Sequence, residues 1–250
     1  MEYDLVGSLS VLNIDEEIAS IIIIQKWYRG CIVRLKRLPT VMYVIKSQLD
    51  KNNISFSNAS NDGRVNSCLD EKLVIEQLSI ILLNRITVPR IRMWYDIAVY
   101  DYMYGWLPVN IKTTRTTTSD NTGNIAMCVY AYTDVKLELN NIYTNGYMSN
   151  ILFTKLRNKE YNTNHKKDYY FIVLNKLNNS VIVNSVKGLV TLTPNINNLP
   201  FQVKWNKNTA FYYGNITKKV NMFIECIQKP KQGWRETFIY NMRSIDLKTR

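Results

Sequence analysis

The chain has 250 residues, of which 46% are apolar and 21% are charged, a balance that excludes a wholly disordered protein and favours one main folded domain. Its formal net charge of +12 favours a polyanionic partner such as DNA, RNA or an acidic membrane surface. Its four cysteines are far apart and it has a single histidine, so zinc-finger patterns, disulfide frameworks and two-histidine mechanisms are excluded.

Residues 15–38 are expected to form a basic helix, because isoleucines and other apolar residues recur there near helical spacing. The middle of this helix resembles the IQ motif, IQxxxRGxxxR, at Ile24, Gln25, Arg29, Gly30 and Arg34. The resemblance implies a helix that is bound by calmodulin or a related EF-hand light chain. Two alternatives remain open: the helix packs on the main domain through its isoleucines, or its basic face lies on DNA.

The location of the protein in the cell is inferred from what the chain lacks. No apolar run reaches the ~18 residues that a membrane span needs, and the acidic N-terminus does not resemble a signal peptide. We therefore expect an intracellular protein that is not secreted. An IQ motif would place it in the cytoplasm or nucleus of a eukaryotic host cell, and is compatible with a viral protein carried in a virion.

A polar, turn-rich stretch at residues 51–63 is the best internal boundary in the chain. It separates an N-terminal helical segment at residues 1–50 from a main domain at residues 51–250. Charge is unevenly distributed across this boundary, since residues 21–49 hold six Lys or Arg and no acid.

A helix is predicted over residues 67–84, just after this boundary. Ser67 can cap it, and Asp70, three residues later, completes a capping box. Glu71 shares a side with apolar residues of the helix, whereas Glu76 points away from that side. Glu71 is therefore the acid of this helix with the best chance of reaching a site on the sheet.

Residues 94–114 are predicted to form two β-strands joined by a short loop, with Asp96 near the start of the first and Asn110 and Lys112 near the end of the second. Alternate residues of a strand share a face, so Asn110 and Lys112 point the same way. A twisted pair of strands would bring all three side chains around one point. Asp101 has the opposite parity from Asp96 and is the poorer partner. The alternative is that Asp96 caps a strand and Lys112 is merely solvated.

The remaining predicted elements complete an α/β pattern. They are a helix or long strand that ends near residue 139, a buried strand at 168–175, a strand at 181–186 that pairs with it as a hairpin, a strand within the segment TPNINNLPFQVKW, and a helix from Trp234.

An acid followed, at the end of the next strand, by x-I-K-T-T resembles the PD-(D/E)xK nuclease core, the fold of many type II restriction endonucleases. Residues 108–114 stand where that family has an acid, a hydrophobic residue and a lysine. The resemblance covers about residues 60–210, and the helix that carries Glu71 is similar to the family's first core helix. It implies an α/β, restriction-endonuclease-like core at residues 51–250, with a central mixed sheet flanked by helices and an N-terminal helical extension.

The resemblance also implies Mg²⁺-dependent hydrolysis of DNA phosphodiester bonds, with Mn²⁺ as a substitute metal. Asp96, the Asn110 amide oxygen and the Ile111 carbonyl would hold the metal, and Glu71 would support a second metal or a water. Lys112 would position or deprotonate the attacking water. Asn110 departs from the family pattern, because an amide is a neutral ligand and should hold Mg²⁺ more weakly. The expected function is a sequence-specific, restriction-like endonuclease, and the alternatives are an inactive DNA-binding protein of the same fold or a calmodulin-binding interaction protein.

Contacts with double-stranded DNA are expected around the end of the lysine strand and in an amide-rich patch later in the chain, since paired Asn or Gln side chains can read adenine. The candidates are Arg64, Arg115, Asn121, Asn124, Asn198 and Gln202. Ordinary turn chemistry of Asn is the alternative for each amide. A palindromic target would imply a symmetric homodimer.

Overall fold

The computed structural model describes residues 22–26, 37–52, 54, 56, 63–195 and 200–228. The chain divides into two compact units, residues 1–37 and residues 38–250. Residues 22–26 of the first unit are helical, as the sequence predicts, and they include Ile24 and Gln25 of the IQ-like motif. The other three motif residues, Arg29, Gly30 and Arg34, lie outside the described residues, as does the helix predicted from Trp234.

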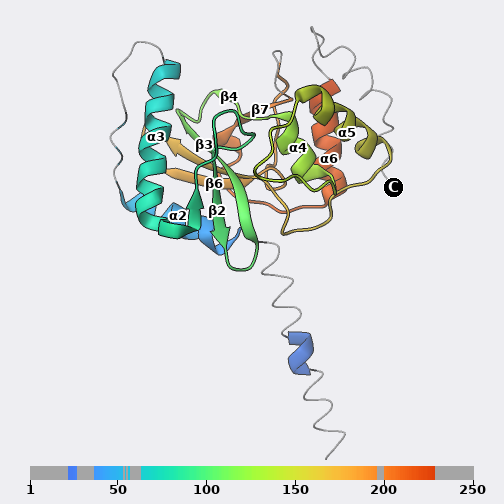
Figure 1. Ribbon diagram of the computed structural model, residues 1–250, viewed down its shortest axis with the longest axis horizontal. Coiled ribbons are helices and arrows are strands. Elements are labelled where there is room, and N and C mark those ends of the chain that lie inside the picture. The colour runs from blue at the N-terminus through green and yellow to red at the C-terminus, as the bar shows by residue number, and fades with distance from the viewer. Residues whose placement is uncertain are drawn as a thin grey trace, which may run out of the picture. The chain divides into compact units, whose positions relative to one another are not determined.

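A mixed five-stranded sheet forms the centre of the second unit (Figure 1). The strand order is β1-β2-β3-β5-β6, and β3 and β5 are parallel whereas the other neighbours are antiparallel. The strands are β1 (Ile86–Thr87), β2 (Ile97–Asp101), β3 (Gly105–Thr114), β5 (Tyr170–Asn175) and β6 (Val181–Ser185). The predicted α/β class and the predicted hairpin of β5 with β6 are both confirmed.

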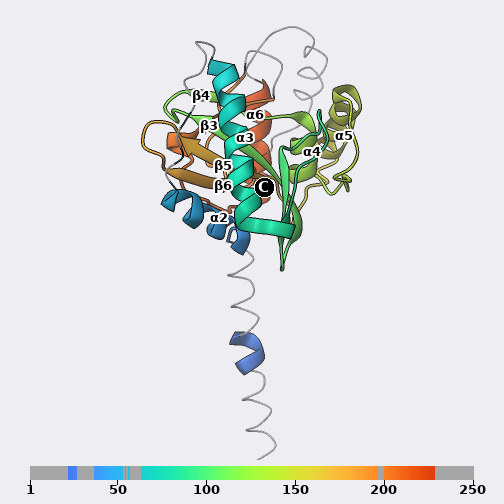
Figure 2. The same ribbon diagram turned by 60° about the vertical axis from the view of Figure 1, so that its left-hand side comes forward.

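Helices cover both faces of the sheet (Figures 1 and 2). α2 (Thr40–Lys51) and α3 (Gly63–Leu82) pack on one face, while α4 (Ile125–Tyr132), α5 (Asn145–Arg157) and α6 (Ile216–Gln228) pack on the other. The sheet contributes side chains to the hydrophobic clusters on both of its faces, because the side chains of a strand alternate between the two faces. For example, Val109 and Ile111 of β3 join the cluster under α2 and α3, whereas Phe171 of β5 joins the cluster under α4 and α6.

A separate two-stranded ribbon pairs β4 (Ser119–Asn121) with β7 (Gln202–Lys204). Two short 3-10 helices, η1 (Leu83–Arg85) and η2 (Trp205–Lys207), follow α3 and β7. α5 and α6 form in segments where the sequence patterns predict no element. None of the helices in the described parts of the chain combines the length and the apolar character needed to cross a membrane.

Two sequence interpretations need correction at the start of this unit. α2 buries Val41, Met42, Ile45 and Leu49 in the core shared with the sheet, so the compact domain begins at residue 38 and not at residue 51. α3 extends N-terminally to residue 63, so the capping-box interpretation of residues 67–70 is wrong: Ser67 lies inside the helix.

Asp101, at the end of β2, ties α2 to the sheet. Its Oδ2 accepts the N–H of Val41 in the first turn of α2 at 3.0 Å. Its Oδ1 accepts the N–H groups of Met103 and Tyr104 in the β2–β3 turn, at 2.9 and 3.2 Å. Asp101 is buried, so this carboxylate replaces water for three main-chain donors at once.

Asp101→Ala is therefore expected to lower the free energy of unfolding by about 2–3 kcal/mol, because it leaves one buried and two partly buried N–H groups without this acceptor. Urea denaturation followed by circular dichroism measures the change. Glu76→Ala removes an exposed carboxylate of α3 and should leave the denaturation midpoint unchanged. Equal losses in the two variants would contradict the capping role of Asp101.

Candidate active site

Asp96 lies immediately before β2, next to the part of β3 that carries Asn110 and Lys112. Ile97 pairs with Val109 in the antiparallel register, and the Asp96 N–H also donates to the Val109 carbonyl, at 3.0 Å, so two successive residues oppose Val109 as in a β-bulge. The Asp96 side chain turns toward β3, where its Oδ2 accepts the Ile111 N–H at 2.8 Å. This bond holds the Asp96 carboxylate at the residue between Asn110 and Lys112.

Lys112 lies two residues beyond Asn110 and therefore on the same face of β3. Its Nζ forms an ion pair with Glu71 Oε1 of α3 at 3.3 Å, and each of the two side chains is about 25% exposed. The positive charge of Lys112 also lowers the pKa of Asp96, which places the two groups within electrostatic reach. The structure thus brings together the four residues that the sequence selected: Glu71, Asp96, Asn110 and Lys112.

Asp120 of β4 is a further acid at this site that the sequence did not indicate. It accepts the Thr114 hydroxyl at 3.1 Å, and Thr114 follows Asn110 and Lys112 on the same face of β3. Burial raises the pKa of Asp120, while Thr114 and the charge of Lys112 lower it. Lys112 therefore lies among three carboxyl groups, which come from α3, from the residue before β2 and from β4.

Asp70 has a structural role beside this site. Its carboxylate is fully buried and pairs with the Lys176 ammonium at 2.6 Å. The Lys176 N–H in turn donates to the Thr114 carbonyl at the end of β3. This ion pair joins α3 to the ends of β3 and β5, one residue before Glu71.

Burial governs the protonation of the two main acids. It raises the pKa of Asp96, against the lowering effects of Lys112 and of the Ile111 N–H. It also raises the pKa of Glu71, which Lys112 lowers and the neighbouring Asp96 charge raises further. Desolvated carboxylates that repel each other favour an additional cation nearby.

The oxygen atoms at this site fit a hard divalent cation. Asn110 Oδ1 is buried and has no hydrogen-bond partner among the described residues, which costs about 1–3 kcal/mol for an amide left unsatisfied. Asn110 adjoins Ile111, whose N–H binds the Asp96 carboxylate, and such oxygen donors are those that Mg²⁺ and Mn²⁺ prefer. In the described part of the chain no three His, Cys, Asp or Glu side chains are grouped to hold a metal ion, so a metal at this site would also need the amide oxygen and a main-chain oxygen as ligands.

Stability should depend on pH through this site. Because burial raises the folded-state pKa of Asp96, its contribution is most favourable below the ordinary carboxyl pKa and is lost as the pH rises through the raised value. Asp96→Asn keeps an oxygen for the Ile111 N–H and removes the charge. We expect this variant to melt at a higher temperature than the original protein at pH 8 in EDTA, with the difference shrinking toward pH 4.

Differential scanning fluorimetry across this pH range measures the effect, and Glu76→Gln is the matched control on an exposed acid. Addition of Mg²⁺ or Mn²⁺ should raise the melting temperature of the original protein and not that of Asp96→Asn. A variant that melts lower than the original protein at pH 8 would show that the Asp96 charge stabilises the fold.

The predicted DNA contacts fall into different environments. Arg115 is exposed immediately after β3, and Asn121 and Gln202 meet across the β4–β7 ribbon. Asn124 caps α4: its Oδ1 accepts the Met127 N–H at 2.7 Å and its Nδ2 donates to the Trp94 carbonyl at 3.0 Å. Both ends of this amide are used within the fold, as a helix cap. The side chain of Arg64 and the whole of Asn198 lie outside the described residues.

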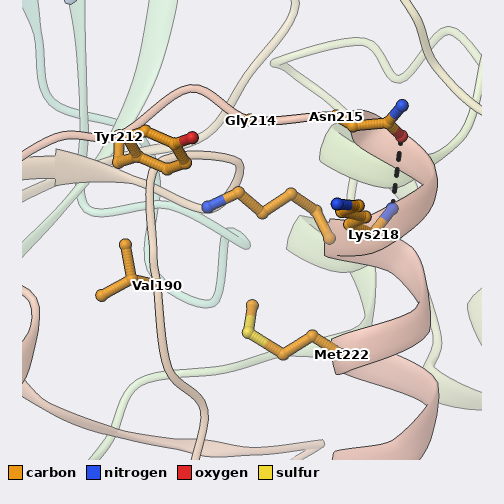
Figure 3. Close-up of a pocket in the computed structure, with 7 residues that line it drawn as sticks. Val190, Tyr212, Gly214, Asn215, Lys218 and Met222 are labelled. Carbon is orange, nitrogen blue, oxygen red and sulfur yellow. Dashed lines mark hydrogen bonds between the residues drawn. The ribbon is translucent and has the colours of Figure 1, made fainter.

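A separate pocket of about 360 Å³ lies at the start of α6 (Figure 3). Its polar groups already serve the fold. Burial lowers the pKa of Lys219 to about 8, and its ammonium donates to the Leu189 carbonyl at 2.6 Å. Asn215 Oδ1 accepts N–H groups of the first turn of α6, including that of Lys218 (Figure 3). None of the lining residues belongs to the site of Glu71, Asp96, Asn110 and Lys112, which is called the β2–β3 site below.

The chain matches no model of a known protein family, and no curated protein shows significant similarity to it. Function is therefore inferred from the residues and geometry of the β2–β3 site. The feature of this site that most needs a chemical explanation is the buried amide oxygen of Asn110, which has no hydrogen-bond partner among the described residues and lies next to Ile111, the residue that binds the Asp96 carboxylate.

Proposed function

We propose that this protein is a Mg²⁺-dependent endonuclease with a restriction-endonuclease-like core, and that it hydrolyses phosphodiester bonds of double-stranded DNA at specific sequences. One observation carries the proposal: the buried Asn110 Oδ1, which has no hydrogen-bond partner among the described residues, adjoins Ile111, whose N–H binds the Asp96 carboxylate, and Lys112 follows on the same strand face. The mixed sheet, with a helix that supplies Glu71 to the strand pair, supports it. The net charge of +12 suits a DNA substrate.

In this proposal Asp96, Asn110 Oδ1 and the Ile111 carbonyl oxygen would hold Mg²⁺. When bound, the metal supplies positive charge to the scissile phosphate and lowers the pKa of a coordinated water. Lys112 Nζ orients the attacking water and offsets negative charge that develops on the phosphate oxygens. Glu71, at 3.3 Å, holds the Lys112 ammonium in that position.

Digestion of a supercoiled plasmid by the full chain tests the proposal. We expect nicked and linear products with Mg²⁺ or Mn²⁺ and none with EDTA. Glu71→Ala should slow cleavage, whereas Glu76→Ala, which removes an exposed acid from the same helix, should not. Sequencing of the product ends then gives the cut sequence and the stagger. A plasmid that stays intact in both metals would contradict hydrolysis.

The second candidate is a DNA-binding protein of the same fold without turnover. Two observations favour it: Asn110 is a neutral ligand, and the Lys112 ammonium is already paired with Glu71. Salt-sensitive binding of the plasmid without cleavage is the result it predicts.

Asn110→Asp separates the two candidates. A carboxylate at position 110 adds a negative charge to the ligand set, so we expect about tenfold tighter Mg²⁺ binding and faster cleavage. The same charge should lower the melting temperature in EDTA, because the new buried carboxylate would repel that of Asp96, which is bound at the neighbouring Ile111 N–H. Isothermal titration with Mg²⁺ and plasmid cleavage rates measure these changes. An Asn110→Asp protein that binds Mg²⁺ tightly and still does not cut would favour the binding protein.

A further inference from the structure

We infer that the β4–β7 ribbon reads an adenine in the major groove of the target DNA, through the side chains of Asn121 and Gln202. The inference rests on the proposed function, because it takes duplex DNA as the substrate, and it names a base that this substrate must contain. The ribbon lies beyond the end of β3, where Asp120 of β4 bonds to Thr114 (Figure 1).

The two faces of the ribbon differ. Asp120 pairs with Val203, which is fully buried in the core, so these two side chains form its inner face. Asn121 pairs with Gln202 and Ser119 pairs with Lys204, so these four side chains form its outer face. Asn121 and Lys204 are exposed. The outer face thus offers amides beside a cation, and a two-stranded ribbon has the width that a major groove admits.

Hydrogen bonds to neighbouring residues hold the two outer amides in place. The main chain of Gln202 exchanges two hydrogen bonds with Thr193, at 2.8 and 2.9 Å, in addition to its pairing with β4. Asn195, which is fully buried, donates from Nδ2 to Asn121 Oδ1 at 3.1 Å. The amide pair is therefore presented on a fixed surface, which reduces the entropy lost when it binds a base.

Hydrogen bonds also fix which end of each amide faces outward. Asn121 Oδ1 accepts from both Asn195 Nδ2 and Gln202 Nε2, the latter at 2.7 Å, and this occupies its two lone pairs. Among the described residues, Asn121 Nδ2 and Gln202 Oε1 make no hydrogen bond. The ribbon therefore presents one donor next to one acceptor.

This pattern complements adenine. The major-groove edge of adenine has an acceptor at N7 and a donor at N6, which match Asn121 Nδ2 and Gln202 Oε1. Guanine presents two acceptors, N7 and O6, and its O6 would face the Gln202 oxygen. Lys204, two residues along the same strand face, is placed to contact a neighbouring phosphate. Because Asp120 anchors the ribbon beside Lys112, the adenine should lie within about one helical turn of the cut bond.

The test is selection of duplexes from a randomised library by the full chain in EDTA, where no strand is cut. We expect every strongly bound duplex to carry adenine at one position. Replacement of that base by 7-deazaadenine, which removes N7 and needs no change in the protein, should weaken binding about tenfold. Asn121→Ala and Gln202→Ala should abolish the preference for adenine, whereas Asn141→Ala, at another exposed amide, should retain it.

A selected set with no required adenine, or a requirement that survives both substitutions, overturns the inference. Failure of the proposed hydrolysis is a separate result, because the selection needs binding only. Adenine-dependent binding without cleavage in Mg²⁺ would leave the inference standing. Cleavage in Mg²⁺ at positions unrelated to adenine would refute the inference, while the proposed nuclease activity would stand.

Discussion

Lys112→Ala is expected to slow plasmid cleavage by about 10²–10⁴-fold, the largest effect of any single substitution at this site. The reason is the position of the ammonium, which lies among Glu71, Asp96 and Asp120 and follows Asn110 on one strand face. Its removal takes away the cation that orients water and offsets phosphate charge. Single-turnover cleavage at saturating protein measures the chemical step apart from DNA binding.

Lys72→Ala, which removes an exposed lysine next to Glu71 on α3, is the matched control and should cut at the original rate. Lys112→Ala should still gain melting temperature when Mg²⁺ is added, because the proposed oxygen ligands remain. If Lys112→Ala cleaves within tenfold of the original rate, Lys112 takes no part in the chemical step, whether or not the metal still binds.

Lys176→Met is expected to lower the free energy of unfolding by about 3–5 kcal/mol, the largest effect on stability. The substitution leaves the fully buried Asp70 carboxylate without the ammonium that lies 2.6 Å away. The substitution should also slow cleavage, because the Asp70–Lys176 ion pair holds α3 where Glu71 can reach Lys112. In addition, the charge of Lys176 helps to lower the pKa of Glu71.

Urea denaturation of three variants tests this pair. Lys166→Met, at an exposed lysine, should change little. The double variant Asp70→Leu/Lys176→Met should recover most of the lost stability, because replacing both partners of a buried pair removes the uncompensated charge. A single Lys176→Met variant as stable as the Lys166→Met control would show that Asp70 is satisfied by other groups.

Much of the sheet could be predicted from the sequence, because strands that are buried on one or both faces have short-range apolar patterns. β5 and β6 appear as apolar runs around the Asn178-Asn179 turn, and they pair as a hairpin in the structure. α6 is not among the predicted elements although Val220, Phe223, Ile224 and Ile227 are buried at helical spacing, which is a signal that the sequence contains. α5 buries only Met148, Leu152 and Leu156 and has a weaker pattern.

The candidate site was partly predictable for a similar reason. Side-chain parity along β3 puts Asn110 and Lys112 on one face whatever the rest of the chain does. Asp120 could not be predicted because its segment, TSDNTGN, has the composition of a turn, and only the contact with Thr114 places it beside the site. The sequence wrongly suggests that Asp70 is a local cap, because its partner Lys176 is far away in the chain.

Local patterns in the chain establish which segments form strands and which side chains of a strand share a face, because these depend on neighbours a few residues apart. Tertiary packing alone decides which acid reaches Lys112, which carboxylate caps α2 and which amides meet on the ribbon. Each of these contacts joins residues about 40 or more positions apart, as Lys112 with Glu71, Val41 with Asp101, and Gln202 with Asn121 do. Their partners are set by the register and packing of whole elements, which no short stretch of sequence encodes.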